Sequence, residues 1–199
     1  MSRRRLLTAL ATAAALSALL AGCSSDPLAE QYREGSSKGF IAGDGSWTEI
    51  PAAKRGDAVT WSGTTENDET VSSTDYADEV VVLNFWYASC APCRAEAPDL
   101  QTLSEAFDGK GAAFLGVNVR DRPANAIAFN ENYGITYPSV MDVADGGMQL
   151  AFSGSIPPNA VPTTLVLDSS GRVAARILGR VSSPSILKTL IRDTIAEDN

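Results

Sequence analysis

Residues 84–96 read NFWYASCAPCRAE and place Cys90 and Cys93 three positions apart, directly behind an apolar, β-branched run. The run from residue 80 to 83 predicts a buried strand, and residues 94–107 predict a helix. The cysteines therefore lie at a strand-to-helix turn, where the free N–H groups of the helix start favour negative charge. A thiol in such a position tends to ionise to the reactive thiolate.

Composition narrows the chemistry that these cysteines can perform. The chain has 199 residues, enough for one domain with its own core plus additional segments. Histidine is absent and Cys23 is the third and last cysteine, which excludes imidazole metal sites, Cys-His catalysis and a scaffold of several disulfides. The formal net charge of −8 repels phosphate backbones, so we expect no nucleic-acid partner.

A Cys-x-x-Cys pair at the start of a helix is typical of thiol–disulfide exchange. We expect the first sulfur to point to solvent and the second to lie one turn in, so we assign attack on a partner disulfide to Cys90 and resolution of the mixed disulfide to Cys93. One alternative is an inert structural disulfide, whose short loop stabilises little. Half of a zinc site is another, but it needs two further Cys or His ligands, and only Cys23 is left to offer.

The N-terminus has the pattern of an export signal. Residues 1–5 are MSRRR, and residues 6–21 form an apolar run shorter than the ~20 residues that span a bilayer comfortably. The run ends in Leu-Ala-Gly-Cys at residues 20–23, which resembles the lipobox of bacterial lipoproteins. That resemblance implies cleavage before Cys23, lipid modification of this residue and anchoring on the outer side of the membrane. An ordinary cleaved signal and a single membrane anchor are the alternatives.

The rest of the chain predicts a tether followed by one α/β domain. After the signal peptide at 1–22, residues 23–50 are polar and rich in Gly and Ser, which indicates a flexible tether, and residues 51–199 form the domain. Its patterns predict a β-hairpin between 58–61 and 70–72, followed by a helical turn at 73–78. They also predict strands at 80–86, 112–119 and 139–141, helices starting near 93 and at 123–133, and a short helix at 147–152. The domain ends with a second hairpin of 163–168 and 172–178 and a closing helix at 184–196. This order argues for a mixed sheet with a parallel central pair and helices on both faces.

Two motifs together resemble the thioredoxin superfamily, and more closely its membrane-associated, extracytoplasmic TlpA- and ResA-like branch. They are Asn-Phe-Trp ahead of Cys-x-Pro-Cys-Arg-x-Glu at 84–96, and Val-Pro-Thr-Thr at 161–164, where a proline directly precedes a core strand. The resemblance runs from Ala58 to the C-terminus. It implies a thioredoxin-like, three-layer α/β/α fold with a central mixed sheet, an N-terminal β-hairpin and an insertion at residues 120–158.

The resemblance also implies roles for residues around the cysteines. Pro162 is expected to be cis and to pack against the pair, while the backbone of Val161 pairs with a bound substrate strand; a trans proline leading into the strand is the alternative. Glu96 matches the acidic residue that this branch keeps three positions after the second cysteine, where it assists proton transfer to the thiols. A solvated carboxylate favoured by the helix dipole is the alternative for Glu96.

The chain departs from the family pattern at Ser89, where tryptophan is usual, and at Ala91. The missing indole removes the usual apolar platform around the first sulfur. Trp86 and Tyr87 are the candidates to replace it, and we therefore count Trp86 among the candidate substrate-binding residues.

These features predict a membrane-anchored, extracytoplasmic thiol–disulfide oxidoreductase with no metal and no cofactor beyond its redox-active disulfide. The resemblance implies that it reduces disulfides of exported proteins, such as apocytochrome c in cytochrome c biogenesis, and that a membrane-spanning thiol donor of the CcdA or DsbD kind recharges it. Outside the cytoplasm no glutathione pool keeps thiols reduced, so a reductant needs such a source. A Dsb-like oxidant and a peroxiredoxin-type peroxidase are the alternatives, although a Cys-x-x-Cys turn fits peroxidase chemistry poorly.

Overall fold

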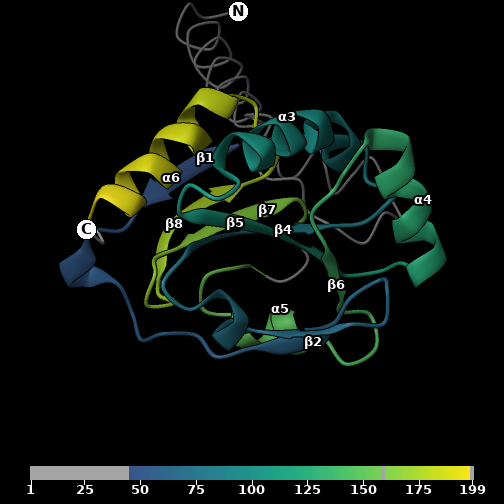
Figure 1. Ribbon diagram of the computed structural model, residues 1–199, viewed down its shortest axis with the longest axis horizontal. Helices are drawn as coiled ribbons and strands as arrows, with labels where there is room; N and C mark the ends of the chain where they lie inside the picture. The colour runs from purple at the N-terminus through teal and green to yellow at the C-terminus, as the bar shows by residue number, and fades with distance from the viewer. Residues whose placement is uncertain (1–44, 158–159, 198–199) are drawn as a thin grey trace, which may run out of the picture. The chain divides into compact units, whose positions relative to one another are not determined.

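The computed structural model describes residues 45–157 and 160–197 (Figure 1). The predicted signal peptide, the lipidation candidate Cys23 and most of the predicted tether lie outside these ranges. The described elements are β1 (Ser46–Glu49), η1 (Ala52–Lys54), β2 (Ser62–Thr64), β3 (Thr70–Ser72), η2 (Ser73–Tyr76), β4 (Val80–Trp86), α3 (Ala91–Phe107), β5 (Ala112–Asn118), α4 (Pro123–Tyr133), β6 (Ser139–Met141), α5 (Gly147–Ala151), β7 (Thr163–Leu167), β8 (Val173–Leu178) and α6 (Pro184–Glu197). None of the helices within the described ranges combines the length and apolar character that crossing a bilayer requires.

Six strands form one mixed sheet in the order β1-β8-β7-β4-β5-β6. The central strand β4 pairs in parallel with β5 and antiparallel with β7, and β5 pairs in parallel with β6. All seven residues of β4 are buried, as expected for a strand that is covered on both faces. The predicted mixed sheet with a parallel central pair is confirmed.

Side chains of β4 alternate between two separate cores. Val80 and Val82 face a core closed by α3 and α6, whereas Leu83 and Phe85 face a core that α5 and the β2–β3 hairpin help to close. The connections β4–α3–β5 and β5–α4–β6 step in the same direction along the sheet, so right-handed crossovers put both helices on the same face. Figure 1 shows α3, α4 and α6 on one side of the sheet and α5 on the other. The predicted helices on both faces are thus present, with the three long ones on a single face.

The β-hairpin forms, but its first strand lies further along the chain than predicted. Residues 62–64, not 58–61, pair with β3, and Trp61 instead enters the core. The strand contains Gly63, where an added Cβ would lie 2.3 Å from Val140 Cγ1 of β6. Because only glycine permits this close approach, a residue typical of turns marks a strand here.

The predicted tether ends earlier than residue 50, so this boundary was wrong. Residues 46–49 form β1, an edge strand paired with β8 in which Trp47 lies opposite Ile177. All four residues of β1 are exposed, so no alternation of apolar and polar side chains distinguishes the strand from a solvated spacer.

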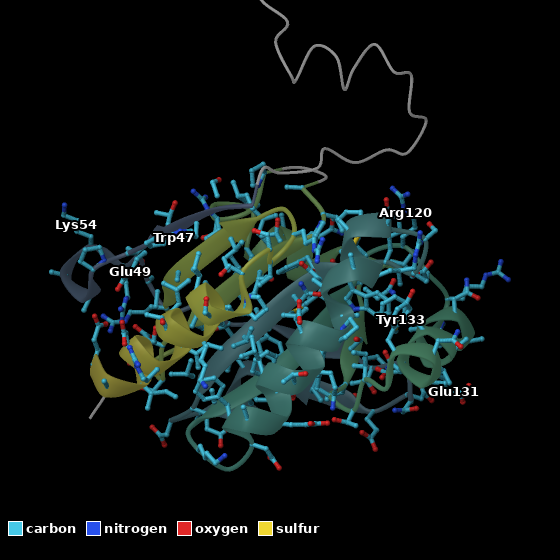
Figure 2. The ribbon with its side chains drawn as sticks, turned by 90° about the horizontal axis from the view of Figure 1, so that it is seen from above. Trp47, Glu49, Lys54, Arg120, Glu131 and Tyr133 are labelled. Carbon is cyan, nitrogen blue, oxygen red and sulfur yellow. A yellow bond between two sulfur atoms is a disulfide. The ribbon has the colours of Figure 1, made fainter. Side chains whose placement is uncertain are left out.

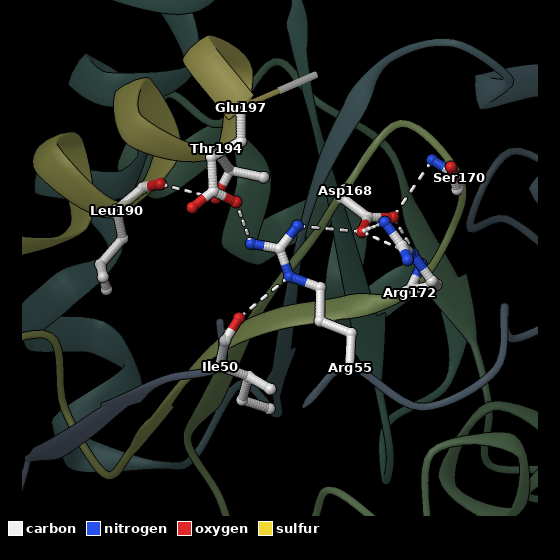
Figure 3. A network of polar contacts seen from close by, with 8 residues as sticks. All are labelled: Ile50, Arg55, Asp168, Ser170, Arg172, Leu190, Thr194 and Glu197. Carbon is white, nitrogen blue, oxygen red and sulfur yellow. Dashed lines mark hydrogen bonds and ion pairs between the residues drawn. The ribbon is translucent and has the colours of Figure 1, made fainter. Parts of the chain in front are cut away.

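A cluster of charged side chains ties the segment after β1 to the rest of the domain (Figure 3). Arg55 donates to Asp168 Oδ2 at 3.1 Å and to the Ile50 carbonyl at 3.0 Å, and it pairs with the Glu197 carboxylate at the end of α6. Burial by itself would raise the pKa of Asp168, but hydrogen bonds from Arg172 and Arg55 hold that pKa below its ordinary value. Asp168 follows β7, so the cluster lies at the sheet edge opposite to the cysteines.

Candidate redox site

The candidate residues gather at one edge of the sheet because four strands begin or end there. β4 and β5 are parallel and end side by side, with Trp86 opposite Asn118. The antiparallel strand β7 starts at the same edge, where Thr163 lies opposite Phe85 and also opposite Leu178, the last residue of β8. Residues from four distant parts of the sequence therefore surround the turn that follows β4.

Cys90 and Cys93 form a disulfide at the first turn of α3, with their Cα atoms 5.2 Å apart. Cys90 is the N-cap residue, and its Sγ accepts a hydrogen bond from the Cys93 N–H at 3.2 Å. Pro92 lies in the first turn, where a helix needs no N–H donor. In the reduced protein the same helix start offers its dipole and free N–H groups to Cys90, which favours the thiolate.

Both cysteines are buried, with exposed fractions of 0% for Cys90 and 2% for Cys93. The expectation that the first sulfur points to solvent is therefore wrong for the oxidised pair. An apolar cluster that includes Trp86, Tyr87 and Val161 packs around the disulfide. Trp86 and Tyr87 thus both belong to the apolar surroundings of the pair in a chain that lacks the usual tryptophan at position 89.

The backbone just before Cys90 is fixed by polar contacts from two sides. Asp121 Oδ2 accepts from the Ala88 N–H at 2.6 Å and from Asn118 Nδ2 at 2.9 Å. Arg94 Nη1 donates to the Ala88 carbonyl at 3.2 Å. Asn118 and Asp121 were not predicted from the sequence, although polar residues at the end of a strand next to β4 are a signal of a shared sheet edge.

Glu96 is fully buried one turn after Cys93. Its Oε1 accepts from Asn84 Nδ2 at 2.9 Å, and its Oε2 accepts from the Val181 N–H at 2.7 Å. Burial raises the pKa of Glu96 to about 7, even though these two hydrogen bonds lower it. The alternative of a solvated carboxylate is therefore wrong. Within the described residues, both oxygens bond to nitrogen donors and neither bonds to a sulfur.

The Val161–Pro162 peptide bond is cis, as predicted. Pro162 is buried, and its carbonyl accepts a hydrogen bond from the Gly179 N–H at 2.9 Å. Val161 is 5% exposed and belongs to the same apolar cluster as Cys90 and Cys93. The structure therefore brings this loop to the cysteine pair, while its contact with a substrate stays a prediction.

Trp86 does not lie on the surface of the site. It is 4% exposed, its Nε1 donates to Ser139 Oγ at 3.2 Å, and its ring centroid lies 4.3 Å from that of Phe129. The indole is thus held between the sheet and α4. Because it offers no surface to a partner, the prediction that Trp86 binds substrate is not supported.

An apolar groove of about 350 Å³ lies beside the cis-proline loop. Its lining includes Phe85, Val119, Leu150, Ile156, Ala160 and Val161. Leu150 of α5 is 75% exposed, so part of this apolar surface faces solvent. The groove leaves room for a side chain beside Val161, which belongs to the same apolar cluster as the cysteine pair.

Comparisons with known proteins agree with this geometry. Residues 55–176 match the AhpC/TSA family. The thiol-disulfide oxidoreductase ResA of Geobacillus thermodenitrificans is 34% identical over 117 residues, which are 59% of this chain and 64% of ResA, so the match spans a little under two thirds of that relative. Among solved structures, a secreted thiol-disulfide isomerase from Corynebacterium glutamicum is 32% identical with a TM-score of 0.69, over 79% of this chain and 96% of that one.

A second structural neighbour, a DsbF homologue from Corynebacterium diphtheriae, is 36% identical with a TM-score of 0.66 and covers 77% of this chain and 97% of its own. Both structural neighbours are matched over almost their whole length. Since the family match also spans more than half of the sequence, the chain belongs to the AhpC/TSA family of thioredoxin-like proteins.

Proposed function

We propose that this protein is an extracytoplasmic thiol–disulfide oxidoreductase that reduces disulfides of exported proteins. The observation that supports this most directly is the Cys90–Cys93 disulfide at the start of α3, beside the cis-proline loop. The pair can hold two electrons as two thiols and release them as one disulfide. The reaction therefore takes no bound cofactor.

The proposed reaction runs in two exchange steps. The Cys90 thiolate attacks one sulfur of a substrate disulfide, which breaks that bond, forms a mixed disulfide and releases one substrate sulfur that takes up a proton. Cys93 then loses its proton and attacks the Cys90 sulfur, which releases the second substrate sulfur as a thiol. The substrate gains two electrons and two protons, and the enzyme returns to the disulfide seen in the structure. Glu96, one turn from Cys93 and with a pKa near 7, is suited to exchange protons with this site.

We further propose that lipidated Cys23 anchors the protein to the outer side of the cell membrane. The lipobox-like sequence before Cys23 and the secreted nature of the Corynebacterium glutamicum neighbour support this location. A membrane-spanning thiol donor of the CcdA or DsbD kind would return two electrons to the oxidised pair. Apocytochrome c, by analogy with the ResA-like branch, is the proposed exported substrate.

Trapping tests the roles of the two cysteines. A Cys93→Ser variant cannot resolve the mixed disulfide, so we expect it to accumulate covalent adducts with exported proteins through Cys90. Non-reducing gel electrophoresis followed by mass spectrometry identifies the linked residue, and a Cys90→Ser variant serves as the control. If Cys90→Ser forms adducts through Cys93 and Cys93→Ser forms none, then Cys93 is the attacking residue and Cys90 the resolving one.

The reduction potential tests the direction of electron flow. A value near that of thioredoxin, ≈ −270 mV, supports a reductant, whereas one near that of DsbA, ≈ −120 mV, identifies a Dsb-like oxidant. Equilibration of the purified protein with glutathione buffers, read by alkylation of free thiols, gives the potential. Peroxide consumption by Cys93→Ser at the rate of the unaltered protein would instead favour the peroxidase alternative.

A further inference from the structure

A small cavity of about 10 Å³ borders Cys93. This is about the space that one water molecule needs. The cavity is lined by residues of α3, β4, α4, β6 and the segment before β6, among them Asn84, Asn130, Tyr137 and Ser139. It therefore joins the resolving cysteine to polar side chains from distant parts of the sequence.

Polar groups that line this cavity have hydrogen-bonding capacity that the described residues leave unused. Asn130 Nδ2 donates to Glu66 Oε1 at 2.9 Å, but Asn130 Oδ1 is buried and has no hydrogen-bond partner among the described residues. Ser139 Oγ accepts from Trp86 Nε1, which leaves the hydroxyl hydrogen to be donated elsewhere. Buried oxygens without a donor are rare in folded proteins, and bound water is a common partner for them. The cavity thus has both the volume and the polar lining that a bound water molecule requires.

Only side chains separate the cavity from the protein surface. Asn130, Ile135 and Tyr137 line the cavity and also line a surface groove of about 540 Å³ between α4 and the turn that joins β2 to β3. Figure 2 shows Glu131, which lines the same groove, at the opposite end of the domain from Lys54. Asn130, Ile135 and Tyr137 therefore form a wall between the space beside Cys93 and solvent.

The resolving cysteine and Glu96 are both shielded from solvent in the oxidised protein. Cys93 is 2% exposed, Glu96 is 0% exposed, and both Glu96 oxygens already accept from nitrogen donors. Burial raises the pKa of Tyr137 and the charge of Glu96 raises it further, so this hydroxyl stays neutral at physiological pH. Arg180 and Asp99 also act on Glu96, the first lowering its pKa and the second raising it. A proton that leaves Cys93 therefore needs a path through the interior.

We propose that the cavity binds one water molecule, and that this water and the Tyr137 hydroxyl carry the Cys93 proton to the surface groove. As Cys93 attacks the mixed disulfide, its S–H bond breaks and the electron pair forms the new bond to Cys90. The water accepts this proton and gives one of its own to the Tyr137 oxygen, and Tyr137 releases its original proton to solvent. Water and tyrosine end unchanged. The inference rests on the proposed oxidoreductase function and adds the route by which its buried thiol is deprotonated.

The rates of the two exchange steps test the inference. Tyr137→Phe removes the hydroxyl and keeps the ring that packs against Phe114. The reduced full-length protein is mixed with excess oxidised glutathione, and mass spectrometry of the Cys90 peptide follows formation and decay of the mixed disulfide. We expect the variant to slow decay, which is resolution by Cys93, about tenfold at pH 7 and to leave formation unchanged. The difference should shrink above the ordinary thiol pKa of about 8.5, because Cys93 is then ionised before it attacks.

A matched variant and a direct observation complete the test. Tyr76→Phe removes a partly buried hydroxyl from the other core and should change neither rate. Unchanged resolution in Tyr137→Phe at pH 7 would overturn the inference, and so would equal slowing of both steps at every pH, which indicates a packing defect. A crystal structure should show an ordered water within hydrogen-bonding distance of Asn130 Oδ1, and a dry cavity would contradict the inference. If the unaltered protein forms no mixed disulfide at Cys90, the proposed function itself fails.

Discussion

Glu96 is held near its midpoint of ionisation at neutral pH by the balance between burial and hydrogen bonding. Both of its oxygens have N–H donors, which favour the carboxylate, yet its pKa rises to about 7 because the side chain is fully removed from water. Desolvation is thus the larger of the two effects. A carboxyl group in this state can give up or accept a proton at the pH where thiol exchange takes place.

The raised pKa predicts that the folded protein loses stability as pH rises. An unfolded chain has Glu96 at its ordinary pKa near 4.5, so between about pH 4.5 and 7 the unfolded state ionises more readily than the folded one. We expect this to cost about 3 kcal/mol of the free energy of unfolding across that window. The side chain of a Glu96→Gln variant cannot ionise, so its unfolding free energy should not fall across this pH window. Urea titrations at several pH values measure the difference.

An exposed glutamate provides the control for that experiment. Glu131→Gln on α4 makes the same chemical change at an exposed position and should leave the dependence of stability on pH almost as in the unaltered protein. If unfolding free energy changes with pH in the same way for the unaltered protein and for Glu96→Gln, burial does not raise the pKa of Glu96.

At the scale of single elements, the loop between β5 and α4 positions the turn that contains the cysteines. Asp121 is the link, since its carboxylate joins the Ala88 N–H to Asn118 at the end of β5. Asp121→Ala leaves a partly buried N–H without its acceptor, so we expect the oxidised protein to lose about 1–3 kcal/mol of stability. Asp121→Asn keeps one acceptor oxygen and should recover part of the loss.

Urea unfolding of the oxidised protein measures this effect, and redox equilibrium with glutathione gives the potential of each variant. Asp57→Ala changes an exposed aspartate on the segment before β2 and should alter neither quantity. If Asp121→Ala lowers stability but leaves the potential at the value of the unaltered protein, Asp121 stabilises the fold without positioning the cysteines.

Elements with a strong local pattern were predictable, and those defined by distant partners were not. The apolar run of β4 and the Cys-x-Pro-Cys start of α3 hold enough information in adjacent residues to fix both elements. β1 has four exposed side chains and exists only because β8 offers its edge, and β2 depends on the close approach of Gly63 to β6. Neither dependence appears in any short window of sequence.

The same distinction applies to the site. Cys90, Cys93 and Pro162 stand in motifs that spacing or family resemblance reveals. Asn118 and Asp121 reach the cysteine turn only through the parallel register of β4 and β5, which places their loop beside it. The burial of Glu96 likewise depends on Val181, which lies 85 positions further along the chain.

At the scale of the whole domain, the redox site and the stabilising charged cluster lie at opposite edges of the sheet. The cysteine edge holds the redox pair, the cis-proline loop and the exposed apolar groove. At the opposite edge Arg55 joins the segment after β1 to Asp168 and to the end of α6. These contacts fasten both ends of the described domain at a distance from the reacting sulfurs, so the reactive edge does not have to supply this stability.

Replacement of Arg55 tests this separation. Arg55→Met removes the hydrogen bonds to Asp168 and to the Ile50 carbonyl. The buried Asp168 carboxylate then keeps only Arg172 as a cationic partner among the described residues. We expect the free energy of unfolding at pH 7 to fall by about 2 kcal/mol, with no change in the reduction potential. Arg192→Met, which breaks an exposed ion pair, should cost less than about 0.5 kcal/mol.

The dependence of this loss on pH identifies its cause. The pKa of Asp168 lies below its ordinary value, so the stability that the cluster gives is present at neutral pH and disappears as acid protonates Asp168 in the folded protein. The difference in unfolding free energy between the unaltered protein and Arg55→Met should therefore narrow as pH falls below about 4, the ordinary range of an aspartate. A difference that stays constant down to pH 2 would mean that Arg55 stabilises the domain by packing, not by its charge.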